Sequence, residues 1–207
     1  MSIWDERFAG EDFVYGIAPN SWLEQQASRI PARGRVLSLG EGEGRNAVWL
    51  AKRGFAVDAV DGSAVGLAKA RRLAEREGVS IATTVGDLAT YQPASAAYDA
   101  VVLVFVHLPP KLRALVHGRA QSALKPGGLV IVEAFTPRQL PRGSGGPKQA
   151  EMLYEPAALQ ADFPSLVWEP LEEVETDLDE GTLHKGVASV VRGVGRLPGK
   201  LELRECF

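Results

Sequence analysis

Three glycines alternate with two glutamates directly after a short apolar run, and this segment has the clearest potential for chemistry. It reads Gly40-Glu41-Gly42-Glu43-Gly44 and leads into a helix-like stretch. Glycine permits unusual backbone dihedral angles and lets a ligand approach the main chain closely. The first turn of the following helix offers unpaired N–H groups. A strand-to-helix turn of this kind lies at the carboxyl edge of an open α/β sheet, where ligands bind.

Two classes of ligand fit this glycine loop. The pattern Gly42-x-Gly44-x-x-Ala47 satisfies a dinucleotide fingerprint and indicates NAD(P). Glu41 and Glu43, however, would stand beside the pyrophosphate, and two carboxylates close to a dianion are unfavourable. S-adenosylmethionine (SAM) has no phosphate and brings a sulfonium and an ammonium that carboxylates attract. The charges favour SAM, and an NAD(P)-dependent oxidoreductase is the alternative, although no Tyr-x-x-x-Lys catalytic pair is evident.

Two further carboxylates follow strand-like segments. Asp61 ends the second such segment, seventeen residues after Gly44, where an acid accepts hydrogen bonds from ribose hydroxyls. Asp87 follows the third in Val85-Gly86-Asp87-Leu88 and is placed to accept a hydrogen bond from an adenine amine. Both positions predict a nucleoside at the same sheet edge as the glycine loop.

Strand-like and helix-like segments alternate along the chain and position these residues. Helices are expected from a capping box at Ser21-x-x-Glu24 and over 45–53, 63–77, 110–124 and 156–163, and strands over 35–39, 55–60, 79–85, 98–105 and 129–134. The alternation predicts a doubly wound α/β fold with a mostly parallel sheet. Segments 166–176 and 182–194 complete seven strands as an antiparallel hairpin, joined by a turn at 177–181.

We expect a single domain over residues 1–207. It divides into an N-terminal flap and helix (1–30), a Rossmann-like core (31–194) and a tail (195–207). The Gly- and Pro-rich segment 138–148 is long enough to form a lid over the site.

In combination, these features resemble the class I SAM-dependent methyltransferases. The resemblance rests on the glycine loop, Asp61, Asp87, the turn Leu124-Lys125-Pro126-Gly127-Gly128 and the terminal hairpin. The segments Trp4-Asp5-Glu6-Arg7-Phe8, Gly44-Arg45-Asn46 and Gly145-Gly146-Pro147 are similar, more narrowly, to bacterial tellurite-resistance or thiopurine-methyltransferase-like enzymes. The resemblance implies transfer of a methyl group from SAM, with S-adenosylhomocysteine (SAH) as product. A SAM-binding protein without catalytic activity is a further alternative.

The predicted cofactor-binding residues are Gly40, Glu41, Gly42, Gly44, Arg45, Asn46, Asp61, Gly62, Ser63, Asp87 and Leu88. One position departs from the family, which usually has an acid where this chain has Ser38. The resemblance assigns that acid to the methionine end of SAM. We hypothesise that Glu41 supplies the missing negative charge.

His107 and Tyr15 are the candidates on the acceptor side. His107 follows a buried strand, and its imidazole can take a proton or bind the acceptor; a structural histidine is the equally weighted alternative. Tyr15 and Trp4 resemble an aromatic flap that covers the cofactor, where rings attract a sulfonium. Because the methyl carbon of SAM is already activated, a base is needed only for an acceptor that arrives protonated. Thiols, chalcogen oxyanions, hydroxyls and amines are all candidate methyl acceptors.

Composition favours a small-molecule acceptor over nucleic acid or membrane partners. The chain has a formal net charge of -3 and no long basic run, which disfavours binding to phosphate backbones. The longest apolar run, Ala100 to Val106, is too short to span a bilayer. A single cysteine, Cys206, excludes an internal disulfide, and the three histidines lack metal-ligand spacing. We therefore expect a cytoplasmic enzyme without a metal.

Overall fold

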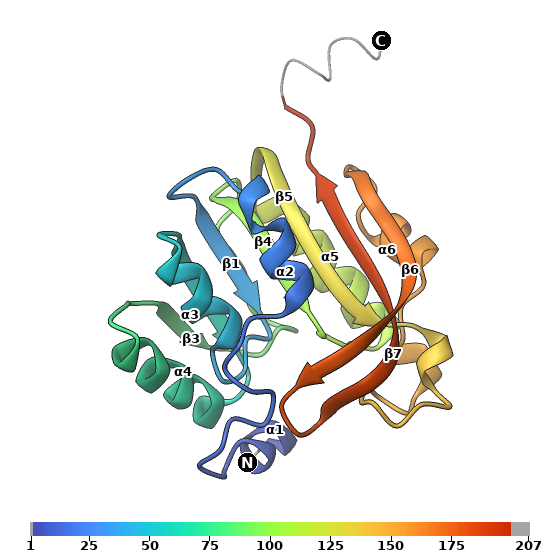
Figure 1. Cartoon of the computed structure of the whole chain (residues 1–207). Coiled ribbons are helices and arrows are strands. Elements are labelled where there is room, and N and C mark those ends of the chain that lie inside the picture. The colour runs from blue at the N-terminus through green and yellow to red at the C-terminus, as the bar shows by residue number, and fades with distance from the viewer. Residues whose placement is uncertain (1, 200–207) are drawn as a thin grey trace, which may run out of the picture.

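The computed structural model describes residues 2–199, which form a sheet with helices on both faces (Figure 1). The helices are α1 (Ile3–Arg7), α2 (Ser21–Gln26), α3 (Arg45–Lys52), α4 (Ala64–Arg76), α5 (Pro110–Ala123) and α6 (Pro156–Asp162). The strands are β1 (Arg35–Leu39), β2 (Ala56–Asp61), β3 (Ala82–Val85), β4 (Tyr98–Val104), β5 (Leu124–Phe135), β6 (Val167–Glu180) and β7 (His184–Arg196).

The seven strands lie in the order β3-β2-β1-β4-β5-β7-β6. The first five are parallel, and β7 runs antiparallel between β5 and β6. The chain winds outward from β1 to β2 and β3, and then returns to place β4 on the other side of β1. A crevice for ligands forms at such a switch point, outside the carboxyl ends of the strands. The predicted seven-stranded sheet with a terminal hairpin is confirmed.

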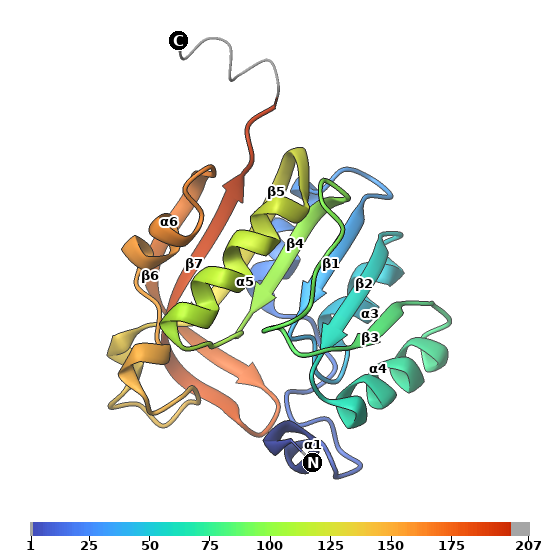
Figure 2. The ribbon, with the colours of Figure 1, turned by 180° about the vertical axis from the view of Figure 1, so that it is seen from behind.

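Side chains that alternate along the inner strands build two cores, one on each face. On β1, Val36 packs toward α2, α3 and α4, whereas Leu37 and Leu39 pack toward α5 and α6. Figures 1 and 2 show the two helical layers from opposite sides. The inner strands read as continuous apolar runs because both faces are buried.

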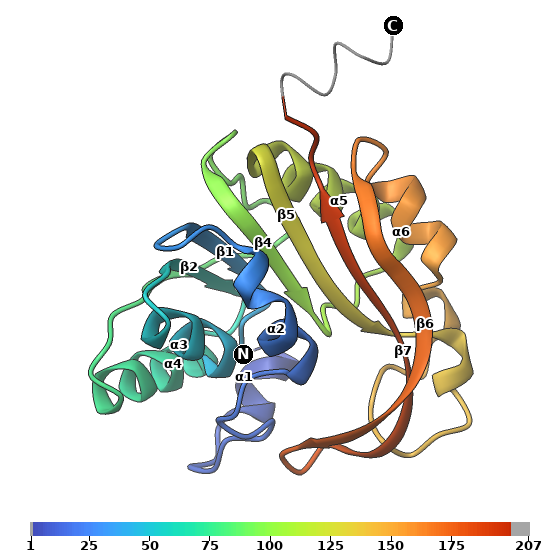
Figure 3. The same ribbon diagram turned by 45° about the horizontal axis from the view of Figure 1, so that its top comes forward.

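The hairpin of β6 and β7 extends past the end of β5. Pairing of β5 with β7 ends at Phe135 and Val190, but pairing of β6 with β7 continues to Glu180 and His184. The free part of the hairpin curves toward α1, as Figure 3 shows. There the Thr182 N–H donates to the Val14 carbonyl at 2.9 Å. The hairpin tip is therefore attached to the N-terminal flap.

The hairpin turn and one helix start differ from the sequence predictions. Segment 177–180 belongs to β6, and the turn lies at residues 181–183, because the strands pair beyond the edge that β5 provides. Helix α2 is capped by Asn20, whose side chain accepts the Leu23 N–H, rather than by Ser21.

The division into flap, core and tail stays a prediction, and Cys206 lies outside the described residues. Within residues 2–199, no helix is long and apolar enough to cross a membrane.

The contact between flap and hairpin can be tested at Gly181, which has a φ of +68°. A Cβ at this position would lie 2.2 Å from the Val14 carbonyl oxygen and 2.6 Å from the Gly16 nitrogen. Gly181→Ala is expected to cost the left-handed strain of about 1–2 kcal/mol and, in addition, to displace the flap. Urea unfolding measures the loss of stability. Limited proteolysis within the flap measures its displacement.

The matched control is Gly78→Ala, where φ is +70° and an added Cβ meets nothing within 4 Å. This variant should lose stability by the strain alone and should keep the flap protected. Equal protease sensitivity of the two variants would contradict the proposed docking of the hairpin tip on the flap.

Candidate active site

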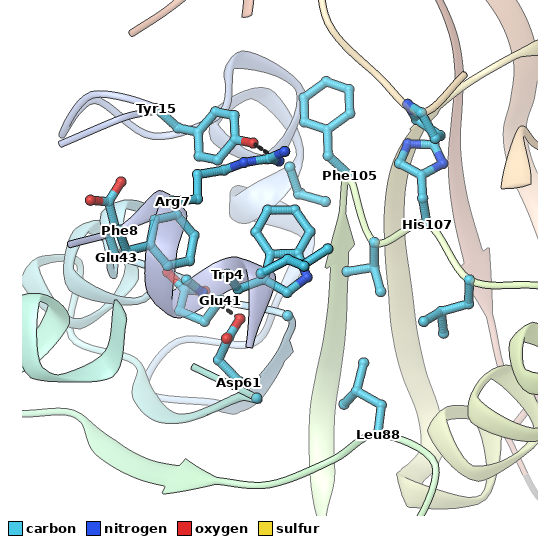
Figure 4. Close-up of a pocket in the computed structure, with 18 of the residues that line it drawn as sticks. Trp4, Arg7, Phe8, Tyr15, Glu41, Glu43, Asp61, Leu88, Phe105 and His107 are labelled. Carbon is cyan, nitrogen blue, oxygen red and sulfur yellow. Dashed lines mark hydrogen bonds between the residues drawn. The ribbon is translucent and has the colours of Figure 1, made fainter. Parts of the chain in front are cut away.

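A cavity of about 990 Å³ opens at the carboxyl ends of β1, β2 and β4. Its walls come from α1 and the flap, the glycine loop, the ends of β2 and β4, the lid segment and the hairpin tip. Figure 4 shows Tyr15 and Arg7 of the flap facing Phe105 and His107, with Asp61 below them. The cavity therefore joins the predicted nucleoside-binding edge to the predicted acceptor side.

The first two glycines of the loop form the cavity wall, whereas the third serves helix packing. Gly40 and Gly42 both have a φ of +64°, and a Cβ on Gly40 would lie 2.8 Å from the Val106 side chain. Gly44 has a φ of +96°, and its Cβ would lie 2.6 Å from that of Ala70 on α4. Gly44 does not line the cavity, so its place in the predicted cofactor site is indirect: it lets α3 approach α4.

Glu41 turns its carboxylate back to the N-terminus of α3. Its Oε1 accepts the N–H groups of Asn46 and Ala47 at 3.1 and 2.8 Å, and its other oxygen accepts the Ser38 hydroxyl. Burial raises the pKa of Glu41 to about 7, against the opposing effect of these hydrogen bonds. The carboxylate of Glu41 thus contacts Ser38, the position where the resemblance implies an acid; that Glu41 supplies the missing charge stays a prediction.

Glu43 lines the cavity, but its carboxylate is engaged by other groups of the chain, in contrast to the sequence interpretation. Its carboxylate lies 2.5 Å from the Lys69 ammonium and accepts the Val14 N–H at 2.8 Å. Because all three groups are packed under the flap, the charge of Glu43 is compensated locally. Glu41 in the loop and Asp61 at the end of β2 are lining carboxylates that have no ion-pair partner among the described residues.

Asp61 lies at the end of β2 and lines the cavity together with Gly62. Its two oxygens accept the N–H groups of Gly42 and Ser63 at 2.8 and 2.7 Å, which fixes the carboxylate beside the glycine loop. Burial raises its pKa, and the two hydrogen bonds oppose that shift. Each oxygen keeps a second lone pair for a ligand hydroxyl.

Ser63 has a structural role in place of the predicted contact with the cofactor. Its hydroxyl caps α4 by accepting the Gly66 N–H at 3.0 Å and donates to Asp5 at 2.7 Å. Ser63 is buried and does not line the cavity, because α1 packs over it.

Asp87 and Leu88 line the far end of the cavity. Asp87 Oδ1 accepts the Ala89 N–H at 2.8 Å, and its other oxygen has no hydrogen bond within the described chain. Leu88 is half-buried and offers an apolar surface beside this free oxygen. The pair fits the edge and the face of a purine ring.

Arg45 and Asn46 lie at the start of α3 and both line the cavity. Arg45 Nη2 donates to Glu180 at 2.8 Å, while its Nη1 is buried without a hydrogen-bond partner. Asn46 accepts the N–H of Asn20 at 2.9 Å and so connects α3 to α2. The unpartnered guanidinium nitrogen is available for an anionic group of a ligand.

His107 lines the cavity, but both of its ring nitrogens are already engaged. Nδ1 is 2.7 Å from the Met152 carbonyl oxygen, and Nε2 accepts the Phe135 N–H at 3.2 Å. Burial lowers the pKa of His107 to about 4, so the ring is neutral at pH 7. In this arrangement no lone pair remains for an acceptor, and the ring joins the end of β5 to Met152, which follows the lid segment.

Tyr15 contributes its ring to the cavity and receives a hydrogen bond from Arg7 on its hydroxyl at 3.2 Å. Burial raises the pKa of the Tyr15 phenol. The Arg7 guanidinium also lies 4.6 Å from the centre of the Trp4 ring. These contacts order the flap over the cavity.

The hairpin tip brings two residues to the site that the sequence reasoning missed. Glu180 accepts hydrogen bonds from Arg45, from the Asn20 amide at 2.9 Å and from His184 Nδ1 at 3.2 Å. His184 lines the cavity beside Tyr15, with 4.5 Å between the two ring centres. A turn signal at Gly181 could have indicated that Glu180 and His184 face each other across it.

The lid segment approaches the cavity through Gly145, Gly146 and Pro147. Its arginines point elsewhere: Arg138 and Arg142 form ion pairs with Glu173 and Glu175 of β6. The cations of the lid are therefore compensated by the acidic strand. Within residues 2–199, no group of three or more His, Cys, Asp or Glu side chains is arranged to hold a metal ion.

Comparison with known proteins gives a family match and one curated relative. Residues 36–128 match the family model of the methyltransferase domain. The chain is 34% identical over 118 residues to the ribosomal RNA small subunit methyltransferase C of Chromohalobacter salexigens. That match covers 52% of this chain and 34% of the relative, so the chain spans about a third of the relative's length.

Solved structures with the same fold cover nearly the whole chain. One, from work on the conversion of a disulfide bond into a thioacetal group during echinomycin biosynthesis, has a TM-score of 0.78 at 17% identity; the match covers 99% of this chain and 96% of that one. The N-methyltransferase NodS from Bradyrhizobium japonicum, in complex with SAH, has a TM-score of 0.69 at 14% identity and covers 94% and 96%. These similarities establish the fold as that of class I methyltransferases.

The buried Glu41 predicts a pH dependence of stability. Its carboxyl has a higher pKa in the folded chain, about 7, than the ordinary 4.5. The folded state therefore binds more protons between these values, and the free energy of unfolding falls as the pH rises from about 4.5 to 7. Titration of Glu41 changes the free energy of unfolding by on the order of 3 kcal/mol over this pH range. Glu41→Gln should remove this part of the slope, as measured by urea unfolding between pH 4.5 and 8.

Glu24→Gln on the exposed surface of α2 is the matched control and should leave the slope unchanged. A Glu41→Gln variant whose stability falls with pH as steeply as that of the native chain would refute the assignment.

Proposed function

We propose that this chain, which belongs to the class I SAM-dependent methyltransferases, transfers the methyl group of SAM to a small acceptor with an apolar body. The family predicted from the sequence is confirmed by the methyltransferase-domain match and the shared fold. The narrower similarity to tellurite-resistance enzymes stays a prediction. The proposal concerns the acceptor and the residues that bind both substrates.

The residues at the cavity edge fit SAM. Asp61 would accept the ribose hydroxyls, and Asp87 the adenine amine. The unpartnered Nη1 of Arg45 would bind the methionine carboxylate, and the cavity wall at Gly40 and Gly42 allows close approach. When bound, SAM supplies an electrophilic methyl carbon on a neutral leaving group. NodS was solved with SAH, which supports the same cofactor in this fold.

The position of Glu41 is the observation that carries the choice of SAM over a dinucleotide. A dinucleotide places its pyrophosphate on the N–H groups at the start of the helix after the glycine loop. In this chain the carboxylate of Glu41 already accepts two of those N–H groups. A pyrophosphate would have to displace a buried carboxylate from its donors, whereas a cationic ligand is attracted by it.

The walls around the acceptor side favour a small apolar molecule. Phe105 and Phe135 stack with 4.6 Å between their centres, and Tyr15 and Leu183 complete the enclosure. Such a site buries most of a small ligand in apolar contacts. A structure related in fold comes from work on a disulfide substrate, which supports sulfur as a reacting atom. We therefore favour an aromatic or otherwise apolar thiol over the other acceptor classes.

RNA is the second candidate, because the curated relative is a ribosomal RNA methyltransferase. The relative matches only about half of this chain. Of the cations near the cavity, Arg45 pairs with Glu180 and Arg142 with Glu175, while Arg7 lies over the Trp4 ring and donates to the Tyr15 hydroxyl. Phosphate binding requires free cations along a surface. The charges around the site thus favour a small molecule.

The protein's part in the reaction is alignment and exclusion of water. Methyl transfer is an in-line displacement, and the rate enhancement comes from holding the nucleophile on the axis of the breaking bond. The flap and the lid enclose the reacting groups, and His107 connects Met152, just after the lid, to Phe135 at the end of β5 through its two backbone contacts. We infer a positioning role for His107 and a wall role for Tyr15.

Calorimetry tests the cofactor assignment. SAM and SAH should bind to the purified chain, and NADH should not. Asp61→Asn should weaken SAM binding at least tenfold, since the charge and one acceptor for the ribose are lost. Glu41→Gln should weaken SAM more than SAH, because only SAM carries the sulfonium charge. Asp58→Asn, on the same strand but paired with Arg35 outside the cavity, is the matched control.

Release of SAH tests the acceptor class. The chain with SAM and a panel of aryl and benzyl thiols should release SAH and form the methyl thioether, whereas small-subunit ribosomal RNA should give no methylated product. Methylation of the RNA alone would overturn the small-molecule assignment. SAM binding without turnover on either acceptor class would favour the non-catalytic alternative.

A further inference from the structure

His184 occupies a position on the acceptor side that the mechanism above does not use. It is the first residue of β7, and its ring centre lies 4.5 Å from those of both Tyr15 and Phe105. The ring lines the cavity next to Phe135. A Cβ on the lid residue Gly145 would lie 2.7 Å from the His184 ring, so only glycine leaves this edge of the ring open.

The two nitrogens of His184 have different environments. Nδ1 lies 3.2 Å from the Glu180 carboxylate, which can only accept, so Nδ1 carries the proton. Nε2 has no hydrogen-bond partner in the described part of the chain and keeps its lone pair. In His107 both nitrogens contact the backbone, which leaves His184 as the histidine with a free acceptor nitrogen at the cavity.

Glu180 is held in a fixed place by three further elements of the chain. Arg45 of α3 and Asn20 before α2 both donate to it, and the strand pairing places it opposite His184. These partners lower the pKa of Glu180 to about 2, although burial opposes the shift. The carboxylate therefore stays ionised and can stabilise a positive charge that develops on the imidazole ring.

The groups that face His184 leave it neutral at pH 7. Burial lowers its pKa below the ordinary 6.5, and the positive charges of Arg45 and Arg7 act in the same direction. Glu180 acts against them. The neighbouring His107 is itself neutral and adds no charge at this pH.

We propose that His184, oriented by Glu180, is the general base that deprotonates the methyl acceptor; this rests on the proposed function. Nε2 takes the proton of the acceptor's S–H or O–H group. The electron pair released on that atom forms the bond to the methyl carbon, and the carbon–sulfur bond of the sulfonium breaks with its pair returning to sulfur. The products are the methylated acceptor, SAH and a His184 imidazolium beside Glu180, which later loses its proton to solvent.

This assignment narrows the substrate class. An oxyanion needs no base, whereas a neutral thiol or phenol gains from one. The histidine and carboxylate pair in an apolar enclosure therefore indicates an acceptor that arrives protonated. Tellurite and other pre-ionised acceptors would leave the pair without a role.

The test compares two thiols at pH 7 with SAM and the full chain. Benzyl mercaptan is protonated at this pH, and 4-nitrothiophenol is ionised. His184→Asn keeps a donor toward Glu180 but lacks the base. It should lower kcat for benzyl mercaptan by about 100-fold or more, and change that for 4-nitrothiophenol by less than about threefold. SAM binding by calorimetry should be unchanged and shows that the variant is folded and loaded.

The matched control is His117→Asn, which alters another buried histidine paired with a carboxylate, Asp162, at 2.8 Å and outside the cavity. The His117→Asn variant should not lower kcat for one thiol more than for the other. His184→Gln serves as a second variant if the Asn variant does not bind SAM. With native protein, kcat for benzyl mercaptan should fall as His184 becomes charged, and the fall should lie at a lower pH than the ordinary histidine pKa of 6.5.

Equal losses on both thiols, or no loss on benzyl mercaptan, would overturn the base assignment while leaving methyl transfer itself established. If the native chain releases no SAH with either thiol, the proposed function fails and the base assignment fails with it. Selective loss on the protonated thiol, with SAM binding intact, supports the assignment.

Discussion

The carboxylate of Glu180 connects the parts of the chain that must come together at the site. It accepts hydrogen bonds from Arg45 on the cofactor helix, from Asn20 at the end of the flap and from His184 across the hairpin turn. A buried carboxylate is costly unless its oxygens are satisfied, and removing one partner leaves the charge uncompensated. The arrangement of flap, helix and hairpin is thus fixed by the need to satisfy one buried charge.

A second buried carboxylate decides what the glycine loop binds. Glu41 binds N–H groups at the N-terminus of α3 and contacts Ser38. The helix dipole and two N–H donors stabilise the ionised form, while burial destabilises it. The balance leaves a pKa near neutrality. Because two N–H groups at the start of α3 already bind Glu41, a phosphate is disfavoured there and a cation is favoured.

The extended hairpin forms the acceptor side of the cavity. Because β6 and β7 pair beyond the end of β5, their tip reaches over the carboxyl edge and meets the flap at Val14 and Gly181. Antiparallel strands can continue as a two-stranded arm where a third neighbour is missing, provided that the arm packs on something. In this fold it packs on the flap and the lid, and the enclosure that results is aromatic and apolar.

The sequence by itself determined the doubly wound sheet with its terminal hairpin and the edge where the cavity lies, because apolar runs, glycine turns and strand-end carboxylates are local signals. It also predicted Glu41 and Asp61 at that edge, and both line the cavity. Only the tertiary structure decided that Glu43 pairs with Lys69, that Ser63 caps a helix and that His107 is engaged on both nitrogens. It alone brought Glu180 to Arg45, 135 positions away in the chain. Such pairings depend on contacts between distant segments, and spacing along the chain carries no record of them.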